Sequence, residues 1–424
     1  MGKFGHIVEF AFMAGLTKWV SQAYGTARSV MQFGEFEHDA DKRHLIRAAD
    51  VSDLRRMAKR RMPRGCFDYI DGAAEDEVSA GRSVSAYHRW QFRPRVLRDV
   101  SEVDISGKIL GESVPIPLVI APTGFDRIAH SQGELAVARA AERAGIPYSL
   151  STMGTRSVEE VADVCDGRKF FQVYVWRDRE LMADLLKRSA AAGYEAIMIT
   201  VDTAVLGRRE RDVRHGFSLP PKLGPDTIID GLLHPRWLLD FLSNEPIKFS
   251  NCEGATGGDG GDAVALAEYI NSQFDPSLSW DDIEWFRDRW DGPVMLKGVL
   301  SPEDAKIAAD MELDAVIVSN HGGRQLDGAP APVECVPAIR EAVGDRCEVI
   351  CDGGIRRGSD IVKALALGAD SAMIGRAYLY ALGAAGETGV DWVLNYFVEG
   401  MTRTMRLNGV RSIADLTPEL LERV

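Results

Sequence analysis

The spacing of apolar residues predicts eight short buried strands between residue 117 and about residue 385. Each is an apolar run too short for a helix, and the segments between the runs repeat apolar residues at helical spacing. The predicted strands cover residues 118–121, 148–150, 170–175, 196–201, 294–296, 315–318, 348–351 and 371–374. The helical patterns between them include residues 133–144, 178–191, 302–310 and 359–367.

This alternation predicts an α/β protein. Eight parallel strands joined by helical crossovers most simply close into a (β/α)8 TIM barrel. An open doubly wound sheet is the alternative, and it would carry a G-x-G-x-x-G turn after its first strand. The sequence has Ala121-Pro122-Thr123-Gly124 at that place, which favours the barrel.

Two regions lie outside the alternation. Residues 1–116 form an N-terminal extension, with helices expected over residues 51–60 and 64–77. Residues 206–279 form an insert after the fourth strand that is far longer than an ordinary connection. Its glycine-rich run, 254–261, follows no strand and is expected to be a flexible loop. For its apolar and aromatic stretch, 232–242, a lid, a subunit contact and a membrane-surface patch all remain open.

The N-terminal segment has its own pattern. Residues 7–33 are rich in apolar side chains with few charges, but lack the basic start and small-residue cleavage site of a secretory signal. An interfacial amphipathic helix and a terminal helix packed on protein are both open interpretations. We therefore predict an apolar segment over residues 1–40 and a barrel domain over 41–424 that includes the insert. The basic stretch 55–61 is either a solvated helix face or a contact for anionic lipid.

Composition excludes several classes of protein. The chain of 424 residues has a formal net charge of −13, which argues against nucleic-acid binding because that needs a basic surface. Its six cysteines are scattered, form no C-x-x-C pair or metal-like cluster, and suit a reducing cytoplasm without disulfides. No segment reaches the roughly 18 uncharged apolar residues that a membrane span needs.

Polar residues follow six of the predicted strands. In a TIM barrel the C-terminal strand ends meet at one mouth, where catalytic residues gather. The residues are Gln172 and Tyr174 after the third strand, Thr200 and Asp202 after the fourth, Lys297 after the fifth, Ser319 and His321 after the sixth, Asp352, Gly353, Gly354 and Arg356 after the seventh, and Gly375 and Arg376 after the eighth. Singly, each could be a helix cap or a solvated side chain, but together they predict one site.

The segment 319–325 carries the most specific chemistry. His321 can take a proton near neutral pH. Arg324, three residues on, can hold a carboxylate with two parallel hydrogen bonds. The glycines between them, Gly322 and Gly323, allow close backbone approach. Together they predict proton abstraction from a small carboxylic acid, whereas a solvated histidine and a surface arginine are the structural alternative.

The last two strand ends predict a phosphate site. Loops after strands seven and eight are the usual phosphate site of a TIM barrel. Gly353 and Gly354 expose backbone N–H groups, Arg356 and Arg376 add positive charge, and a helix is expected to begin near Gly375. A phosphate monoester fits these features.

Lys297 refines the identity of that ligand. At the fifth strand end, its ammonium could stabilise negative charge on a flat, electron-accepting ring, and with the phosphate site this indicates flavin mononucleotide (FMN). Pyridoxal phosphate, with Lys297 as Schiff base, is the rival ligand. It would leave His321 and Arg324 without an evident role.

Several strings resemble those of the FMN-dependent 2-hydroxy acid oxidase and dehydrogenase family. They are residues 206–210, 296–299, 319–325 and 352–357, and the resemblance runs from about residue 50 to the C-terminus. Within the family, residues 67–76, 234–237 and 375–380 look most similar to the bacterial quinone-linked L-lactate dehydrogenases.

The resemblance implies a role for each site residue. His321 is the active-site base, and Asp202 stabilises its protonated form. Arg324 and the Tyr69 hydroxyl hold the substrate carboxylate, with Arg209 as a second cation. Lys297 lies beside the N1–O2 edge of the flavin and favours its anionic reduced form. Tyr174 contacts the substrate hydroxyl as it becomes a carbonyl. Ala121, Pro122, Thr123, Ser151, Gln172, Thr200 and Ser319 are expected to line the flavin, and Asp352, Gly353, Gly354, Arg356, Gly375 and Arg376 to hold its ribityl and phosphate groups.

The implied function is FMN-dependent oxidation of an L-2-hydroxy acid. L-lactate to pyruvate is the expected reaction, with quinone as acceptor. A dioxygen-using oxidase of glycolate, mandelate or a longer acid and a non-catalytic flavin-binding barrel are the alternatives. A homotetramer or larger homo-oligomer is expected, cytoplasmic or peripheral on the inner face of the cell membrane. Met153 stands where glycolate-oxidase-like members carry tryptophan, so the acid stays open, as does the choice between hydride and carbanion chemistry.

Overall fold

The computed structural model describes residues 37–215, 224–252, 269 and 272–424. The chain divides into two units, residues 1–43 and 44–424, and the fold below is that of the second. The helix α2 (Ala40–Leu45) spans the boundary in sequence. The predictions made for residues 7–33 and for the glycine run 254–261 lie outside the described residues.

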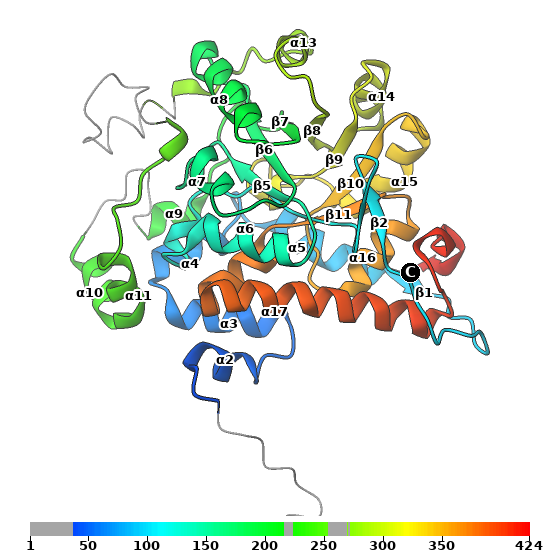
Figure 1. Ribbon diagram of the computed structural model, residues 1–424, viewed down its shortest axis with the longest axis horizontal. Helices are drawn as coiled ribbons and strands as arrows, with labels where there is room; N and C mark the ends of the chain where they lie inside the picture. The colour runs from blue at the N-terminus through cyan, green and yellow to red at the C-terminus, as the bar shows by residue number, and fades with distance from the viewer. Residues whose placement is uncertain (1–36, 216–223, 253–268, 270–271) are drawn as a thin grey trace, which may run out of the picture. The chain divides into compact units, whose positions relative to one another are not determined.

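The eight predicted strands form one closed parallel barrel (Figure 1). In chain order they are β4 (Leu118–Ile120), β5 (Tyr148–Ser151), β6 (Lys169–Tyr174), β7 (Ala196–Thr200), β8 (Val294–Val299), β9 (Ala315–Val318), β10 (Glu348–Asp352) and β11 (Ser371–Ile374). Every residue of β4, β5, β7, β9 and β11 is buried, as expected for parallel strands covered on both faces. The predicted TIM barrel is confirmed, and the open doubly wound sheet is excluded.

Helices follow the strands around the outside of the barrel (Figure 1). They are α6 (Gly133–Arg143), α7 (Val158–Ala162), α8 (Arg179–Ala191), α14 (Pro302–Asp310), α15 (Pro332–Val343), α16 (Gly358–Ala366) and α17 (Arg376–Asn408). Local sequence sets several starts: the Ser157 and Ser301 side chains accept hydrogen bonds from the first turns of α7 and α14. The long α17 is interrupted at Ala385 and Gly386 and packs on α3 and α6.

The N-terminal extension corrects one prediction. It forms α3 (Val51–Arg61), α4 (Arg64–Asp71) and α5 (Val78–Ser85), so the helix expected over residues 64–77 is wrong beyond Asp71. Gly72 ends α4 at a place where a Cβ atom would lie 2.5 Å from the Asp68 carbonyl oxygen. Glu75 and Glu77 then adopt positive φ angles of 48° and 62°, which a helix cannot contain. The segment instead reaches the arginines of the barrel mouth.

A β-hairpin closes the opposite end of the barrel. Its strands are β2 (Gly107–Ile109) and β3 (Glu112–Val114). Ile109 and Val114 belong to one buried cluster with barrel-interior residues such as Phe170 and Met295. Glu348, which begins β10, accepts hydrogen bonds from the backbone N–H groups of residues 110 and 111. A short ribbon of β1 (Trp90–Phe92) and β12 (Leu421–Arg423) completes the sheets. The open end of the barrel is therefore the one at the C-terminal ends of its strands.

The insert between β7 and β8 combines helices and irregular loops among its described residues. It contains α9 (Glu210–Arg214), α10 (Pro225–Leu233), α11 (Pro235–Leu242) and α13 (Asp281–Arg287). α10 and α11 contact each other, and α9 contacts α4. Across the described ranges, no helix combines the length and apolar character needed to cross a membrane.

Candidate active site

A cavity of about 430 Å³ opens at the C-terminal mouth of the barrel, within the size range of small-molecule sites. The N-terminal extension, the strand ends and the start of the insert all contribute to its wall. Among the predicted site residues, its lining includes Tyr69, Ala121, Pro122, Thr123, Tyr174, Arg209, Lys297, His321, Arg324, Asp352, Gly353, Gly354, Arg356, Gly375 and Arg376. The structure thus brings together side chains from almost the whole length of the barrel domain.

His321 is held by Asp202, its predicted partner. His321 Nδ1 lies 3.0 Å from Asp202 Oδ1. Burial by itself would raise the pKa of Asp202, but the charge and hydrogen bond of His321 outweigh burial and the pKa is lowered. An ionised Asp202 makes Nδ1 the donor nitrogen, so Nε2 of His321 is the nitrogen that can accept a proton.

The backbone around His321 is a left-handed turn that requires glycine. His321 has a φ of 56°, and Gly322 and Gly323 follow at 65° and 75°. A Cβ atom on Gly323 would lie 2.6 Å from the Ala80 backbone nitrogen. Gly323 therefore allows close packing against α5, and Gly322, where a Cβ atom would lie 2.6 Å from Arg376 Nη1, allows that side chain to approach the turn.

Two guanidinium groups flank the ring of Tyr69. The Cζ atoms of Arg324 and Arg209 lie 5.0 Å and 5.3 Å from its centroid. Arg209 forms an ion pair with Asp212 at 3.2 Å. Burial and the charge of Arg209 lower the pKa of Arg324 to about 10, so Arg324 stays charged at neutral pH. Two cations facing one cavity favour an anionic ligand.

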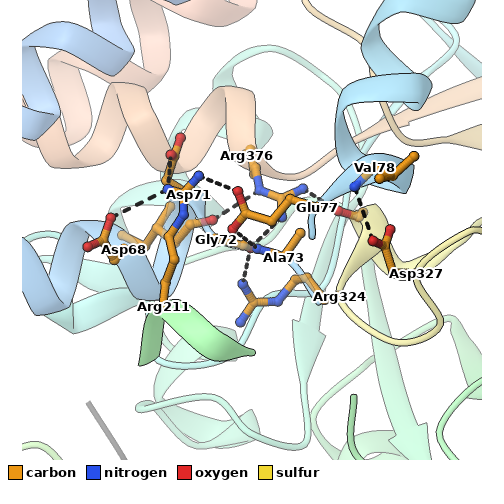
Figure 2. A network of polar contacts seen from close by, with 12 residues as sticks. Asp68, Asp71, Gly72, Ala73, Glu77, Val78, Arg211, Arg324, Asp327 and Arg376 are labelled. Atoms are coloured by element: carbon orange, nitrogen blue, oxygen red, sulfur yellow. Dashed lines mark hydrogen bonds and ion pairs between the residues drawn. The ribbon is translucent and has the colours of Figure 1, made fainter. Parts of the chain in front are cut away.

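Segment 69–77 of the N-terminal extension is held at the mouth of the barrel by Arg324, Arg376 and Arg211 (Figure 2). Arg324 Nη1 donates to the carbonyl oxygens of Tyr69 at 2.6 Å and Gly72 at 3.0 Å. Arg376 donates to the carbonyl oxygens of residues 70, 72 and 322. On the other side, Arg211 of α9 forms ion pairs with Asp68, Asp71 and Glu77. These contacts hold the segment across the mouth of the barrel.

Lys297 is a buried ammonium group with a buried counter-ion. Its side chain is 5% exposed, and Nζ lies 3.3 Å from Asp352 Oδ2 and 3.1 Å from Ser319 Oγ. Ser319 Oγ also donates to Asp352 Oδ2 at 2.7 Å. The triad fixes one positive group at the cavity floor, beside the seventh strand end. Tyr174 also lines the cavity, and burial raises its pKa, which keeps its hydroxyl protonated at neutral pH.

Five predicted residues do not line the cavity itself: Ser151, Gln172, Thr200, Asp202 and Ser319. Three of them form a row across neighbouring strands, in which Ser151 Oγ donates to Gln172 Oε1 at 2.7 Å and Gln172 Nε2 donates to Thr200 Oγ1 at 2.9 Å. The other two hold His321 and Lys297. They support the residues that do line the cavity.

The seventh and eighth strand ends fit a phosphorylated cofactor. Gly353 and Gly354 have φ angles of 100° and 80°, and a Cβ atom on Gly354 would lie 2.0 Å from the Ser83 carbonyl oxygen. The helix α17 begins at Arg376 with Gly375 as its N-cap, so its positive end faces the cavity that Gly375 lines. Backbone N–H groups, a helix N-terminus and Arg356 suit a phosphate monoester, and Lys297 suits a ring that becomes anionic. The residues present therefore fit FMN.

Asp212 and Phe274 are among the cavity residues that the sequence did not predict. Asp212, the partner of Arg209, follows it at the i,i+3 spacing of a helix, but no helix was predicted over residues 210–214. Phe274 reaches the cavity from the end of the insert and contacts the Tyr174 ring edge-on at 5.6 Å. No sequence pattern predicts that contact, because it depends on how the insert returns to the barrel. Met153, which the sequence singled out, does line the cavity.

Comparisons with known proteins agree with this geometry. The model of the FMN-dependent dehydrogenase family matches residues 58–423. A protein of Mycobacterium tuberculosis is 46% identical over 390 residues, covering 92% of both chains. The L-lactate dehydrogenase of Caulobacter vibrioides is 43% identical, covering 89% of this chain and 98% of its own. A solved structure, the monotopic membrane protein (S)-mandelate dehydrogenase, matches with a TM-score of 0.86 and 39% identity, over 89% of this chain and 100% of that one. This chain therefore belongs to the FMN-dependent dehydrogenase family and is an oxidoreductase that uses FMN.

Proposed function

We propose that this enzyme oxidises an L-2-hydroxy acid, with L-lactate to pyruvate as its reaction, and passes the electrons to a membrane quinone. The observation that carries the proposal is that His321, held by Asp202 from behind, lines one cavity with Arg324 and Arg209. A base and two cations are what a hydroxy acid needs: one proton acceptor, and fixed positive charge for its carboxylate. Relatives named L-lactate dehydrogenase, at 41–43% identity, support lactate.

The mechanism assigns one task to each group. Arg324 and Arg209 bind the substrate carboxylate and so fix the orientation of the α-carbon. The Tyr174 hydroxyl donates to the substrate oxygen as it becomes a carbonyl. His321 Nε2 takes one of the two protons that the acid loses, and ionised Asp202 stabilises the resulting imidazolium. FMN, when bound, would take up the two electrons together with the second proton. His321 is the proton acceptor whether the proton comes from the α-carbon or from the hydroxyl oxygen of the substrate.

Mandelate is a second candidate substrate. The solved structure with a TM-score of 0.86 is a mandelate dehydrogenase. In this chain Met153, Phe125 and Phe274 supply apolar surface to the cavity, and a methionine can adapt to side chains of different size. A phenyl ring and a methyl group are therefore both to be tested.

We also infer that the enzyme attaches to a membrane and forms a homo-oligomer. The exposed apolar helices α10 and α11 and a relative described as a monotopic membrane protein support peripheral attachment to the inner face of the cell membrane. That position suits a quinone dissolved in the bilayer. A homotetramer or larger homo-oligomer is part of the proposal, and light scattering of the purified protein tests it.

A flavin-reduction experiment tests the reaction. The FMN-loaded enzyme is mixed anaerobically with L-lactate, (S)-mandelate, glycolate or D-lactate, and the visible flavin absorption is followed. L-lactate is expected to bleach the flavin fastest and D-lactate not at all. The reduced enzyme is then mixed with a soluble quinone analogue or with air. Faster reoxidation by air would replace the quinone proposal with an oxidase, and failure of every acid to bleach the flavin would refute the substrate class.

A further inference from the structure

A second cavity, of about 660 Å³, lies between α3, α4, α9 and the junction of α10 with α11. Its lining is strongly basic. The residues are Arg55, Lys59, Met62, Arg64, Phe67, Asp68, Arg211, Arg214, His215 and His234. Five of these ten side chains are lysine or arginine, and only one is acidic. In a protein with a formal net charge of −13, such a concentration of positive charge marks a site for an anion.

Some of these cations are already paired and form a fixed inner wall. Arg55 Nε lies 2.5 Å from Asp71 Oδ1, and Arg211 Nη1 lies 2.7 Å from Asp71 Oδ2. Burial by itself would raise the pKa of Asp71, but hydrogen bonds from Arg55, Tyr380 and Arg211 hold it below its usual range. Asp71 is thus a permanent anion that positions two guanidinium groups at the cavity.

Two other cations are available to a ligand. Within the described residues Lys59 forms no ion pair, and its ammonium lies 5.8 Å from the centroid of the Phe67 ring. Arg64 has an exposed side chain, and its ion pair with Asp68 is long, at 3.7 Å. Both belong to the rim of the cavity, so an anion entering it gains two new partners without breaking a short ion pair.

The helices beside this cavity expose apolar side chains. Neither α10 nor α11 contains a buried residue. The large exposed apolar side chains on the two helices are Ile228, Ile229, Leu232, Leu233, Leu239, Phe241 and Leu242. Solvent exposure of so many apolar side chains on adjacent helices is unusual unless something covers them.

Specific contacts hold the two helices in this exposed position. Trp237 Nε1 donates to the Ile128 carbonyl oxygen at 2.7 Å, and Asp240 accepts from the Ser131 hydroxyl and backbone N–H. The Arg64 backbone N–H donates to Asp230 of α10 at 2.6 Å. His234, between the two helices, lines the basic cavity. The apolar helices and the basic cavity are therefore fixed side by side.

We propose that this cavity binds the phosphate group of an anionic phospholipid while the apolar side chains of α10 and α11 enter the adjoining boundary of headgroups and acyl chains. The proposal rests on the membrane association proposed above and names its lipid partner. Peripheral attachment is stronger where apolar burial and attraction to anionic lipid act together, and His234, at the junction of α10 and α11, lines the basic cavity. A soluble phosphate would use the cavity but leave the apolar helices uncovered, which favours lipid.

The test uses the full-length FMN-loaded protein with two kinds of vesicle. One is phosphatidylcholine alone, and the other contains one part phosphatidylglycerol to three of phosphatidylcholine. The variant Lys59→Gln/Arg64→Gln removes the two rim cations. The variant Arg60→Gln is the matched control, because it removes an exposed charge from the same helix outside the cavity lining. Thermal melting confirms that each variant is folded.

At about 1 kcal/mol per basic residue near the surface, the double variant is expected to bind anionic vesicles about tenfold or more weakly than the wild type. Binding to phosphatidylcholine and the rate of flavin reduction should not change, and Arg60→Gln should lose about threefold or less. An equal loss in both variants, or none in either, would overturn the cavity as the site. Tight binding of inorganic phosphate to the protein without vesicles, abolished in the double variant, would replace lipid with a soluble anion.

The outcomes separate this proposal from the others. If the wild type binds both kinds of vesicle equally, membrane association stands and the lipid site falls. If it binds neither, both fall while lactate oxidation is untouched. If L-lactate fails to reduce the flavin but the double variant still binds anionic vesicles more weakly than the wild type, the lipid site stands and the substrate assignment falls.

Discussion

The barrel strands and the helix pair α10–α11 are both rich in apolar residues, yet the fold treats them in opposite ways. Leu150 and Val318 in the strands have no exposed surface, whereas Leu233 in α10 and Leu242 in α11 expose 73% and 68%. Burial stabilises the first group by about 1.5–3 kcal/mol per large side chain. The second group contributes no such stabilisation in the isolated chain. Apolar sequence therefore marks the core in one region and a contact surface in the other.

The two regions also have different proposed functions. The strand ends of the barrel hold His321, Lys297 and Asp352 beside the cofactor site, and the insert carries the surface that we assign to the membrane. Substitutions in one region should leave the activity of the other unchanged.

The largest effect is expected at the catalytic base. His321→Gln removes the proton acceptor, and general-base catalysis contributes about 10²–10⁴-fold, so kcat/KM for L-lactate should fall towards the upper end of that range. Vesicle binding should be unchanged. His88→Gln, which alters an exposed histidine, is the control. Unaltered turnover in His321→Gln would revive the non-catalytic flavin-binding barrel.

Arg324→Met should have the next largest effect. It leaves the substrate carboxylate without its buried guanidinium, and breaking such a pair costs about 2–5 kcal/mol. We expect kcat/KM to fall by about 10²–10³-fold, measured by anaerobic flavin reduction over a range of lactate concentrations. Arg208→Met removes an exposed arginine from the same mouth and should change it less than about tenfold. Similar losses in the two variants would show that charge at the mouth, and not the Arg324 contact, captures the acid.

Leu239→Ser/Leu242→Ser tests the other region. If these side chains enter lipid, losing two buried leucines should weaken vesicle binding by about tenfold to a hundredfold, with flavin reduction unchanged. Leu407→Ser, at an equally exposed leucine on α17, should have no effect in a sedimentation assay. Retained vesicle binding in the double variant would assign α10 and α11 to a subunit contact or a lid instead.

The smallest effect concerns a carboxyl pair buried behind the cavity. Asp126 and Glu134 are almost fully buried, and Glu134 accepts two hydrogen bonds from Thr155. Burial and the charge of Glu134 raise the pKa of Asp126 well above its usual value, so Asp126 holds a proton that the unfolded chain releases above about pH 4.

A raised pKa stabilises the fold at low pH, and this stabilisation is lost as pH rises from the unfolded towards the folded value. Asp126→Asn cannot titrate and should therefore be more stable than the wild type at pH 8, by about 2 °C in Tm, with no gain at pH 4. Thermal melts across that range provide the measurement. A difference that stays constant with pH would mean that Asp126 is ionised in the folded protein.

The sequence predicted the barrel well because its rules are local. A parallel strand buried on both faces is a continuous apolar run, so seven of the eight strands were predicted within one residue of both ends, and the other, 294–296, stopped three residues before the end of β8. The helix expected over residues 64–77 failed for a non-local reason. Its last residues have adequate helix propensity, but the carbonyl oxygens of residues 69, 70 and 72 accept hydrogen bonds from Arg324 and Arg376, which lie about 250–300 residues further along the chain.

The site shows the same limit. Polar strand ends predicted which residues meet at the mouth, because the geometry of a TIM barrel is regular. They did not reveal that the side chains of Ser151, Gln172 and Thr200 form hydrogen bonds with one another across neighbouring strands. The basic stretch 55–61 was visible, but its cavity was not, because Arg211 and Arg214 come to it from the insert.

The short helix α9 is a wall of both cavities. Arg209 and Asp212 face the active site, whereas Arg211 and Arg214 face the basic cavity. The short ion pairs of Arg211 with Asp71 and Glu77 keep this helix in place when an anion binds to Lys59 and Arg64. One rigid turn of helix therefore supplies charged groups to two sites, and each site can be occupied or empty without disturbing the other.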